Sequence, residues 1–378
     1  MIFGLLLGIP FAMLLIQSWN SARDLRNPAA DFVFMSYILS FVLTVVVHEV
    51  GHLLAGWMVG FRFSYISVGP LSLKLEYGRL KLRLQRAMPA AGYAGMHLDR
   101  VRRLRRRLLF FTVAGPLANL LSAAVSAILL DYFLSASKSW LYFPIEIFLG
   151  ISLIIGLVNL VPFRLGMLYT DGARIAMLLS SRPRSRRWIC IMALANQNQR
   201  GVRSKHLRRT WLQAASSLSD GSVDDFAGNW MAYASANDRK EASLAALHLE
   251  RCLALVNLLG PTTQDLVALE AAVFTAWFRK DAVTSQKWRE QVRKFKAIPQ
   301  LLRIRADVAL PCARTEYDQA LTVWERGSAF IEALPVSAVQ RQLKDGWLEW
   351  QGEIRERQQT AAVIASIDPT SLIQAPSA

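Results

Sequence analysis

Two histidines spaced four residues apart lie inside an apolar segment that is long enough to cross a membrane. The segment runs from about Phe32 to Val59, and the histidines are His48 and His52. A helix of about 20 apolar residues spans a bilayer, so this segment is predicted to be a transmembrane helix. Residues four apart share one face of a helix, and ionisable groups inside hydrocarbon are costly unless they serve a function. The pair is therefore predicted to hold one metal ion.

Glu49 completes the pattern His48-Glu49-Val50-Gly51-His52. A zinc ion lowers the pKa of a bound water, and a neighbouring carboxylate accepts the water's proton during attack on a carbonyl. The spacing is therefore typical of a zinc-dependent hydrolytic site with Glu49 as general base. The alternative is a chance pair of histidines packed on a helix. It is disfavoured because the chain contains only 5 histidines, and the full pattern falls within an apolar span.

A candidate third ligand follows the last apolar segment. That segment, residues 141–161, ends before Pro162, and Gly166 and Gly172 permit irregular backbone around Asp171. Irregular backbone at membrane depth is tolerated only where it is buried or lines a cavity. Taken alone, Asp171 would be interpreted as a turn residue before a glycine. Beside the histidine pair, it is predicted to be the third zinc ligand.

Hydropathy predicts an α-helical membrane protein with about four transmembrane helices. Of the 378 residues, 53% are hydrophobic, and these concentrate in the first half of the chain. The predicted spans are residues 1–19, 32–59, 108–130 and 141–161, with a cleaved signal peptide as the alternative for the first. Arginines cluster at residues 100–107 and 182–187, so the positive-inside rule places both termini and the C-terminal region in the cytoplasm of a multi-pass protein of the cell membrane.

The net charge of +16 is explained by arginines next to apolar spans. These side chains are predicted to contact anionic lipid of the bilayer, and no nucleic-acid partner is expected. Cys190, Cys252 and Cys312 lack the spacing of a disulfide framework or a metal site, which indicates a reducing compartment.

Residues 72–84 alternate between apolar and mostly charged side chains on both sides of Tyr77-Gly78. A period of two around a glycine predicts a β-hairpin with one apolar face. Because the hairpin follows the histidine segment, we expect it to be membrane-associated and to lie beside the metal site. A surface hairpin without functional consequence is the alternative.

The second half of the chain is predicted to be a soluble all-α domain. Apolar residues recur at helical spacing in three predicted helix pairs, residues 226–256, 265–296 and 301–334. This pattern indicates either tetratricopeptide-like repeats or an ordinary helical bundle. The expected organisation is a membrane core at residues 1–180, a basic linker at 181–203, the helical domain at 204–359 and a disordered tail at 360–378.

Residues 32–180 resemble the site-2 protease family of intramembrane zinc metalloproteases. The resemblance rests on three motifs that occur in the family's order: the histidine–glutamate pattern at 48–52, Gly115-Pro116-Leu117-Ala118-Asn119, and Asn159-Leu160-Val161-Pro162 followed by Asp171-Gly172. The hairpin is also similar to the family's membrane re-entrant β segment. The interval between Pro162 and Asp171 is longer than in many members, and the helical C-terminal region differs from their usual additional domains.

The resemblance implies an intramembrane endopeptidase that cleaves transmembrane segments of membrane-protein substrates. It assigns Zn²⁺ ligation to His48, His52 and Asp171, the general base to Glu49, and substrate binding to Asn159 and Asn119. A substrate helix must unwind locally, and the hairpin could receive it as an added strand. Two alternatives are an inactive relative that binds membrane proteins as a scaffold, and a zinc-dependent membrane enzyme of another kind whose helical region docks a cytoplasmic partner.

Overall fold

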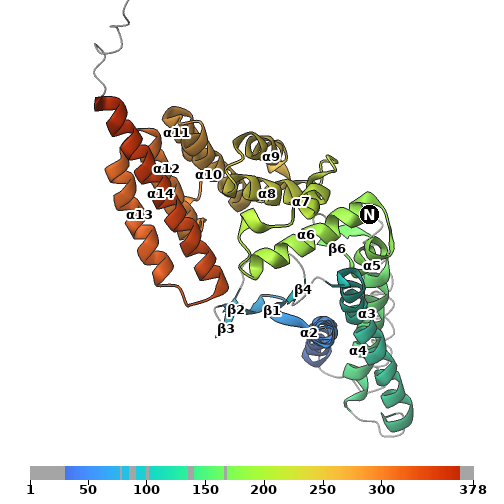
Figure 1. The fold of residues 1–378 in the computed structure, drawn as a ribbon. Coiled ribbons are helices and arrows are strands. Elements are labelled where there is room, and N and C mark those ends of the chain that lie inside the picture. Colours follow the sequence, from blue (N-terminus) through green and yellow to red (C-terminus); the bar gives the residue numbers. More distant parts are fainter. Residues whose placement is uncertain are drawn as a thin grey trace, which may run out of the picture. The chain divides into compact units, whose positions relative to one another are not determined.

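The computed structural model describes residues 30–76, 79–84, 91–98, 102–134, 140–165 and 168–366. The chain divides into two compact units, one ending at Ser185 and the other beginning at Arg186 (Figure 1). This division lies close to the expected end of the membrane core at residue 180.

Three helices of the first unit are long and apolar enough to cross a membrane. They are α2 (Ala30–Met58), α3 (Leu104–Ile128) and α4 (Tyr142–Leu160), and a π-helical turn, η1 (Leu129–Leu134), continues α3. These three helices confirm the second, third and fourth predicted spans. The predicted first span, residues 1–19, lies outside the described residues. By length and hydropathy, the described residues therefore contain three candidate transmembrane helices, which is the pattern of a multi-pass membrane protein.

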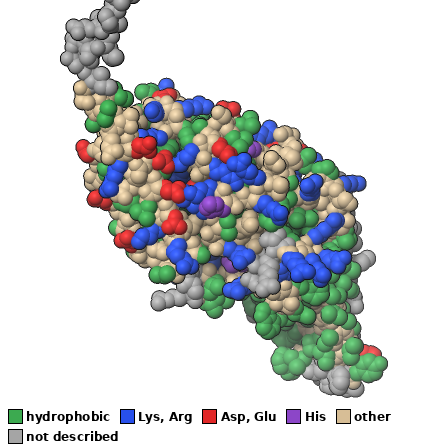
Figure 2. Space-filling view, viewed as in Figure 1, with side chains coloured by type: hydrophobic (Ala, Val, Ile, Leu, Met, Phe, Trp, Pro, Cys, Tyr) green, Lys and Arg blue, Asp and Glu red, His purple; other side chains and the backbone are tan. Residues whose placement is uncertain are grey.

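The three membrane helices turn apolar side chains outward and small or polar side chains toward one another. Phe34 and Leu39 on α2 are exposed, whereas Thr44 is fully buried, and its hydroxyl lies 3.0 Å from that of Ser152 on α4. Figure 2 shows apolar side chains covering the end of the molecule where α3 and α4 lie. Lipid tails are as apolar as the helix side chains, so burying apolar surface between helices gives little driving force in a membrane. Hydroxyl contacts and the close packing of small residues hold the helices together instead.

A four-stranded antiparallel sheet follows α2. Its strands are β1 (Phe61–Val68), β2 (Leu71–Glu76), β3 (Arg79–Leu84) and β4 (Gly92–Leu98), in the order β3-β2-β1-β4. The predicted hairpin is confirmed as β2 and β3, with Leu73 opposite Leu82. Neither β1 nor β4 was predicted. β4 contains two glycines, which have low strand propensity, so only its pairing with β1 makes it a strand.

The irregular segment expected after Pro162 contains a short two-stranded ladder, β5 (Arg164–Leu165) with β6 (Leu168–Tyr169), and then α5 (Asp171–Leu179). Thr170 is the N-cap of α5. Its hydroxyl accepts a hydrogen bond from the Ala173 amide at 3.2 Å and donates to the Val161 carbonyl at 2.8 Å. The cap thereby ties the start of α5 to the end of α4.

The second unit is all-helical. After α6 (Pro183–Gln199) and α7 (Arg209–Ser216) come three helix pairs, α8 (Val223–Asp238) with α9 (Ala242–Ala254), α10 (Pro261–Phe278) with α11 (Ala282–Glu290), and α12 (Gln300–Ala313) with α13 (Tyr317–Glu332), followed by α14 (Ala338–Ser366). Short 3₁₀ turns lie at Ser204–His206, Val256–Leu258 and Phe295–Ala297. The three predicted pairs are confirmed. Each pair turns through a residue with positive φ, namely Lys240, Lys280 or Thr315.

The first helices of the three pairs begin at residues 223, 261 and 300, a wider spacing than the roughly 34 residues of tetratricopeptide repeats. Their core includes Trp324 of α13 and Trp347 of α14. Each indole N–H donates to the other residue's carbonyl, at 2.8 and 3.0 Å. The helical spacing of apolar residues in the sequence predicts the paired helices correctly, because each helix has its own apolar stripe.

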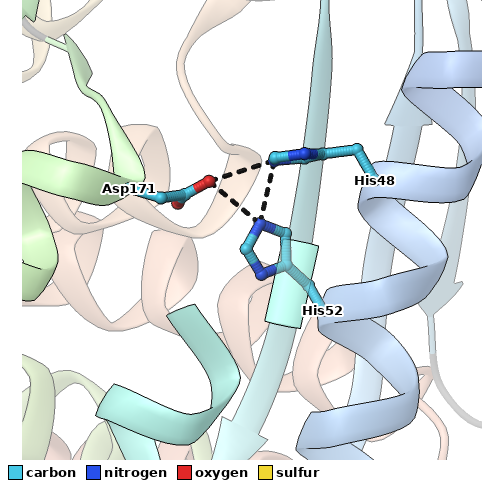
Figure 3. A group of neighbouring side chains, drawn as sticks. All are labelled: His48, His52 and Asp171. Atoms are coloured by element: carbon cyan, nitrogen blue, oxygen red, sulfur yellow. Dashed lines mark hydrogen bonds and ion pairs between the residues drawn. The ribbon is translucent and has the colours of Figure 1, made fainter. Parts of the chain in front are cut away.

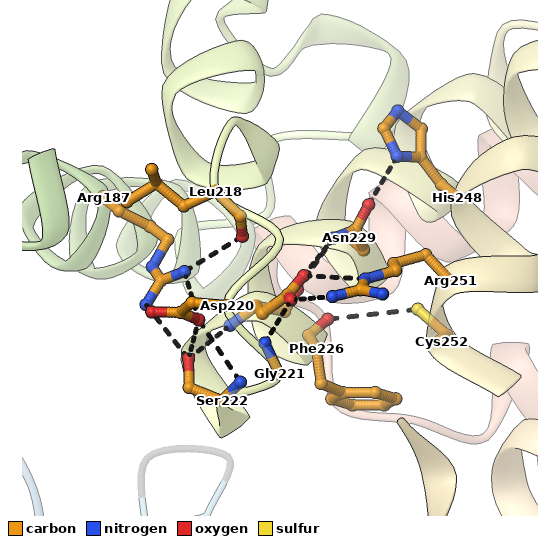
Figure 4. Close-up of polar contacts among 11 residues, drawn as sticks. Arg187, Leu218, Asp220, Gly221, Ser222, Phe226, Asn229, His248, Arg251 and Cys252 are labelled. Atoms are coloured by element: carbon orange, nitrogen blue, oxygen red, sulfur yellow. Dashed lines mark hydrogen bonds and ion pairs between the residues drawn. The ribbon is translucent and has the colours of Figure 1, made fainter. Parts of the chain in front are cut away.

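The segment expected to be a basic linker, residues 181–203, is largely occupied by α6. Its arginines are not all solvated: Arg187 is 1% exposed and makes a two-pronged ion pair with Asp220 at 3.0 Å, alongside a hydrogen bond to Ser222 (Figure 4). Asp225 forms a second group of contacts, with Arg251 and Asn229. The chain's last helix, α14, also reaches Ser366, so residues 360–366 are helical and not disordered, and residues 367–378 lie outside the described part.

Candidate metal centre

Three side chains from two helices meet inside the membrane unit (Figure 3). His48 and His52 project from successive turns of α2, and Asp171 is the first residue of α5. The Asp171 Oδ2 atom lies 3.0 Å from His48 Nε2 and 3.3 Å from His52 Nε2, and the two Nε2 atoms are 3.2 Å apart. All three residues are at most 7% exposed. Among the described residues, they form the one group of three or more His, Cys, Asp or Glu side chains that could hold a metal.

The spacing of these three atoms suits a tetrahedral zinc ion. Zinc binds imidazole nitrogen and carboxylate oxygen at about 2.0–2.1 Å, which places tetrahedral ligand atoms about 3.3 Å apart. The three separations of 3.0–3.3 Å lie close to this value. Two histidines with one carboxylate also leave the fourth position open, as catalytic zinc sites do. The residues present therefore fit a catalytic zinc ion.

Asp171 also contacts a cation of its own helix. Arg174, one turn along α5, lies 3.7 Å from the other carboxylate oxygen of Asp171. Between Pro162 and Asp171, the β5–β6 ladder and the Thr170 cap bring the start of α5 back to the end of α4.

Residues of helix α3 contact the Nδ1 atoms of both histidine rings and so fix their orientation. The His52 Nδ1 atom lies 2.8 Å from the Phe111 carbonyl, to which it donates, and the Phe111 ring stacks on the His52 ring with centroids 5.0 Å apart. With Nδ1 carrying the proton, Nε2 of His52 presents its lone pair toward Asp171 and His48. A carbonyl contact of this kind is typical of metal-ligating histidines.

Asn119 takes the corresponding position behind His48. It is fully buried, and its side-chain amide lies 3.2 Å from His48 Nδ1, while its Oδ1 atom has no partner among the described residues. A histidine that ligates through Nε2 carries its proton on Nδ1 and needs an acceptor there. Turning the amide by 180° supplies Oδ1 as that acceptor. The orphaned oxygen is therefore accounted for if His48 binds a metal.

Two glycines allow backbone to approach the site. A Cβ atom on Gly115 of α3 would lie 2.3 Å from His52 Nε2, and one on Gly92 of β4 would lie 2.4 Å from a carboxylate oxygen of Glu49. Neither distance is possible between non-bonded atoms, so both positions require glycine while the neighbouring side chain keeps its place. The close approach of Gly115 to His52 explains why the motif that ends in Asn119 begins with a glycine. Gly92 shows that β4 lies directly against Glu49, which is itself 5% exposed.

The two asparagines predicted to bind substrate differ in their contacts with the site. Asn119 reaches the site through His48, whereas Asn159 is half-buried near the end of α4, and none of the described residues hydrogen-bonds its side chain. Phe111 and Gly92 contact the site but were not singled out from the sequence. No local pattern marks Phe111, because it acts on His52 through its backbone carbonyl. The two glycines in the β4 sequence are the only signal that could have indicated Gly92.

Residues 36–138 match the family model of peptidase family M50, the family of the site-2 proteases. The matched segment includes α2, the four-stranded sheet and α3, and therefore both histidines, Glu49 and Asn119, while Asp171 lies beyond it. No curated protein and no solved structure matches the chain. The resemblance to this family is thus confirmed over residues 36–138.

Proposed function

We propose that this protein is an intramembrane zinc endopeptidase that cleaves peptide bonds in transmembrane segments of other membrane proteins. One observation carries the proposal: His48, His52 and Asp171 converge at zinc-ligand spacing, and Glu49 lies beside them on a candidate membrane helix. The match of residues 36–138 to peptidase family M50 supports the hydrolytic chemistry.

The proposed mechanism assigns separate roles to the ligands and to the base. His48, His52 and Asp171 would hold a zinc ion, which would acidify water and polarise the scissile carbonyl. Glu49 accepts the proton of the attacking water and later delivers it to the leaving amine. Glu49 is 5% exposed, so its carboxylate has few competing water molecules. Asn119 and Phe111 fix the orientations of the histidine rings.

The sheet offers a surface for an unwound substrate. Peptide bonds of a helix are hydrogen-bonded and shielded, so a substrate helix must open before it is cleaved. The sheet has two edge strands: β4 lies against Glu49, and β3 lies at the opposite edge. The Leu80, Leu82 and Leu84 side chains of β3 are 60–75% exposed. An edge strand can pair with an extended peptide, and its leucines are suited to an apolar sequence or to lipid.

We further propose that the bilayer side bearing the arginines of residues 100–107 is cytoplasmic, together with both termini and the helical unit. Anionic lipid would then contact these arginines, and the helical unit would be available to a cytoplasmic partner.

The decisive experiment compares Glu49→Gln with the wild-type chain. Glutamine keeps the shape of the side chain but cannot act as the base, so one zinc per chain should remain while cleavage falls by at least about 100-fold. Zinc is measured by elemental analysis, and cleavage by quantifying membrane-protein fragments in cells that express each chain. Glu250→Gln makes the same chemical change at an exposed position on α9 and should alter neither quantity.

Cleavage at the wild-type rate by Glu49→Gln would refute the assigned base. Stoichiometric zinc with no membrane-protein fragments from either the wild-type chain or Glu49→Gln would favour a zinc-binding scaffold for membrane proteins. Absence of zinc from a folded wild-type chain would refute the metal site itself.

A further inference from the structure

The arginine cluster that precedes α3 divides into two structural groups. Arg102, Arg103, Arg105 and Arg106 are exposed, and Arg107 is half-buried. Arg105 and Arg107 donate hydrogen bonds to backbone carbonyls at the ends of other helices. Residues two positions apart on a helix point about 200° away from each other, so these two arginines reach opposite sides of α3. The charge pattern alone predicts one common function for the cluster, and the contacts separate two residues from it.

Arg105 binds the C-terminal end of α5, the helix that begins with Asp171. Its Nε donates to the Leu178 carbonyl, and its Nη2 donates to the Ser180 carbonyl at 2.6 Å. The last carbonyls of a helix lack partners within the helix, and a cation there also interacts favourably with the helix dipole. α5 has no basic residue of its own in its last turn. Arg105 therefore supplies this cap from α3.

This cap matters for Asp171 because α5 is short. The helix has 9 residues, so its ends are about 12 Å apart, and helices of this length are marginal without external contacts. Thr170 holds the first end of α5 and Arg105 holds the other. With both ends fixed, the position of Asp171 relative to α3 is fixed as well.

Arg107 binds the C-terminal end of α2, the helix that carries His48 and His52. Its Nε donates to the Val59 carbonyl at 2.8 Å, and its guanidinium lies over the Phe61 ring, 4.9 Å from the centroid. Phe61 in turn contacts Phe111, with centroids 5.8 Å apart. Phe111 is the residue that stacks on His52 and accepts its Nδ1–H. A continuous series of contacts therefore leads from Arg107 to a predicted zinc ligand.

We infer that Arg105 and Arg107 are positioning residues of the metal centre, which fasten the two ligand-bearing helices, α5 and α2, to the same end of α3. This inference rests on the proposed metal site. It differs from a lipid-anchoring function because it depends on the geometry of two guanidinium groups and not on their charge alone.

The test uses the full-length protein in lipid nanodiscs and the variants Arg105→Gln, Arg107→Gln and Arg106→Gln. The last is the matched control, since it removes the same charge from an exposed neighbour. Zinc-loaded protein is mixed with a chromogenic chelator and the release rate is followed. We expect release to be roughly tenfold faster from the first two variants, because each loses charge-assisted hydrogen bonds, and unchanged from the control. Cobalt-substituted Arg105→Gln should also show an altered visible absorption spectrum.

Arg105→Lys separates geometry from charge. Lysine keeps the positive charge that lipid would recognise but cannot donate to two carbonyls from a rigid fork, so zinc release should remain faster than from the wild type. Equal release rates from the wild type and Arg105→Gln, or equal acceleration by all three glutamine variants, would overturn the inference.

Amide hydrogen exchange gives a readout that does not require metal. Arg105→Gln should accelerate exchange within α5 roughly tenfold, and Arg106→Gln should not. If the wild-type chain bound no zinc, the proposed function would fail, and the exchange data would still decide whether Arg105 fastens α5. Unchanged exchange in α5 would refute that contact whatever the metal content.

Discussion

Replacing Gly115 with alanine tests the metal centre through a single methyl group. The added Cβ would lie 2.3 Å from His52 Nε2 and 2.5 Å from His52 Cε1. Ordinary van der Waals contact begins near 3.4 Å, so the ring would have to move by about 1 Å. It cannot simply rotate away, because the Phe111 carbonyl holds Nδ1 and the Phe111 ring stacks on it. Zinc–nitrogen distances tolerate only about 0.2 Å.

We therefore expect Gly115→Ala to weaken zinc binding by at least about 10–100-fold and to reduce cleavage by at least about 100-fold. Alanine is a better helix former than glycine by about 1 kcal/mol, so the substitution should not weaken α3 itself. A loss of zinc affinity would therefore come from the contact with His52. Zinc affinity is measured by competition with a chelator of known affinity, and folding by thermal unfolding of the zinc-free protein.

Gly352→Ala makes the same change at an open position on helix α14. Its Cβ would meet no heavy atom within 4 Å, so no neighbouring side chain has to move. This variant should keep wild-type zinc affinity. If Gly115→Ala also bound zinc with wild-type affinity, then His52 could not be a ligand in the observed geometry, and the reasoning would be refuted.

Three further predictions concern other parts of the structure. Asn119→Leu should weaken zinc binding by about 10–100-fold whereas Asn119→Asp, which keeps an acceptor for His48, should retain it; equal affinities in a chelator competition would contradict this role. Leu82→Pro should lower cleavage without loss of zinc and Leu82→Val should be nearly silent, since proline removes an edge-strand donor; unchanged fragment levels would show that the hairpin is structural only. Hydrogen bonds from Arg203 hold the pKa of Glu349 at about 2, below its usual 4.5, so its contribution to folding is complete above pH 4.5 and is lost as the pH falls toward 2. Glu349→Gln should therefore reduce the acid sensitivity of thermal unfolding followed by tryptophan fluorescence, and an identical pH dependence would exclude this ion pair as a source.

Local patterns in the sequence determined many of the elements and most of the candidate ligands. The apolar segments marked three helices that the structure contains, and the alternation on both sides of residues 77–78 marked β2 and β3. Helical periodicity located the three pairs of the C-terminal unit. His48 and His52 were recognisable because their spacing by itself places them on one face of one helix, and Glu49 was recognisable because it directly follows His48 in the same pattern. Asp171 was identified only by its combination with that helix.

The tertiary structure alone decided which distant residues support the site. Phe111 is 59 residues from His52, and Asn119 is 71 residues from His48. The sequence does not distinguish Arg105 and Arg107 from the other arginines of residues 100–107. β4 has too many glycines to be recognised as a strand. Sequence periodicity records which face of an element is apolar, because that property repeats along the chain. A backbone carbonyl or a missing Cβ that meets a side chain on another element leaves no such repeat, so these contacts become visible only after the helices and strands have packed.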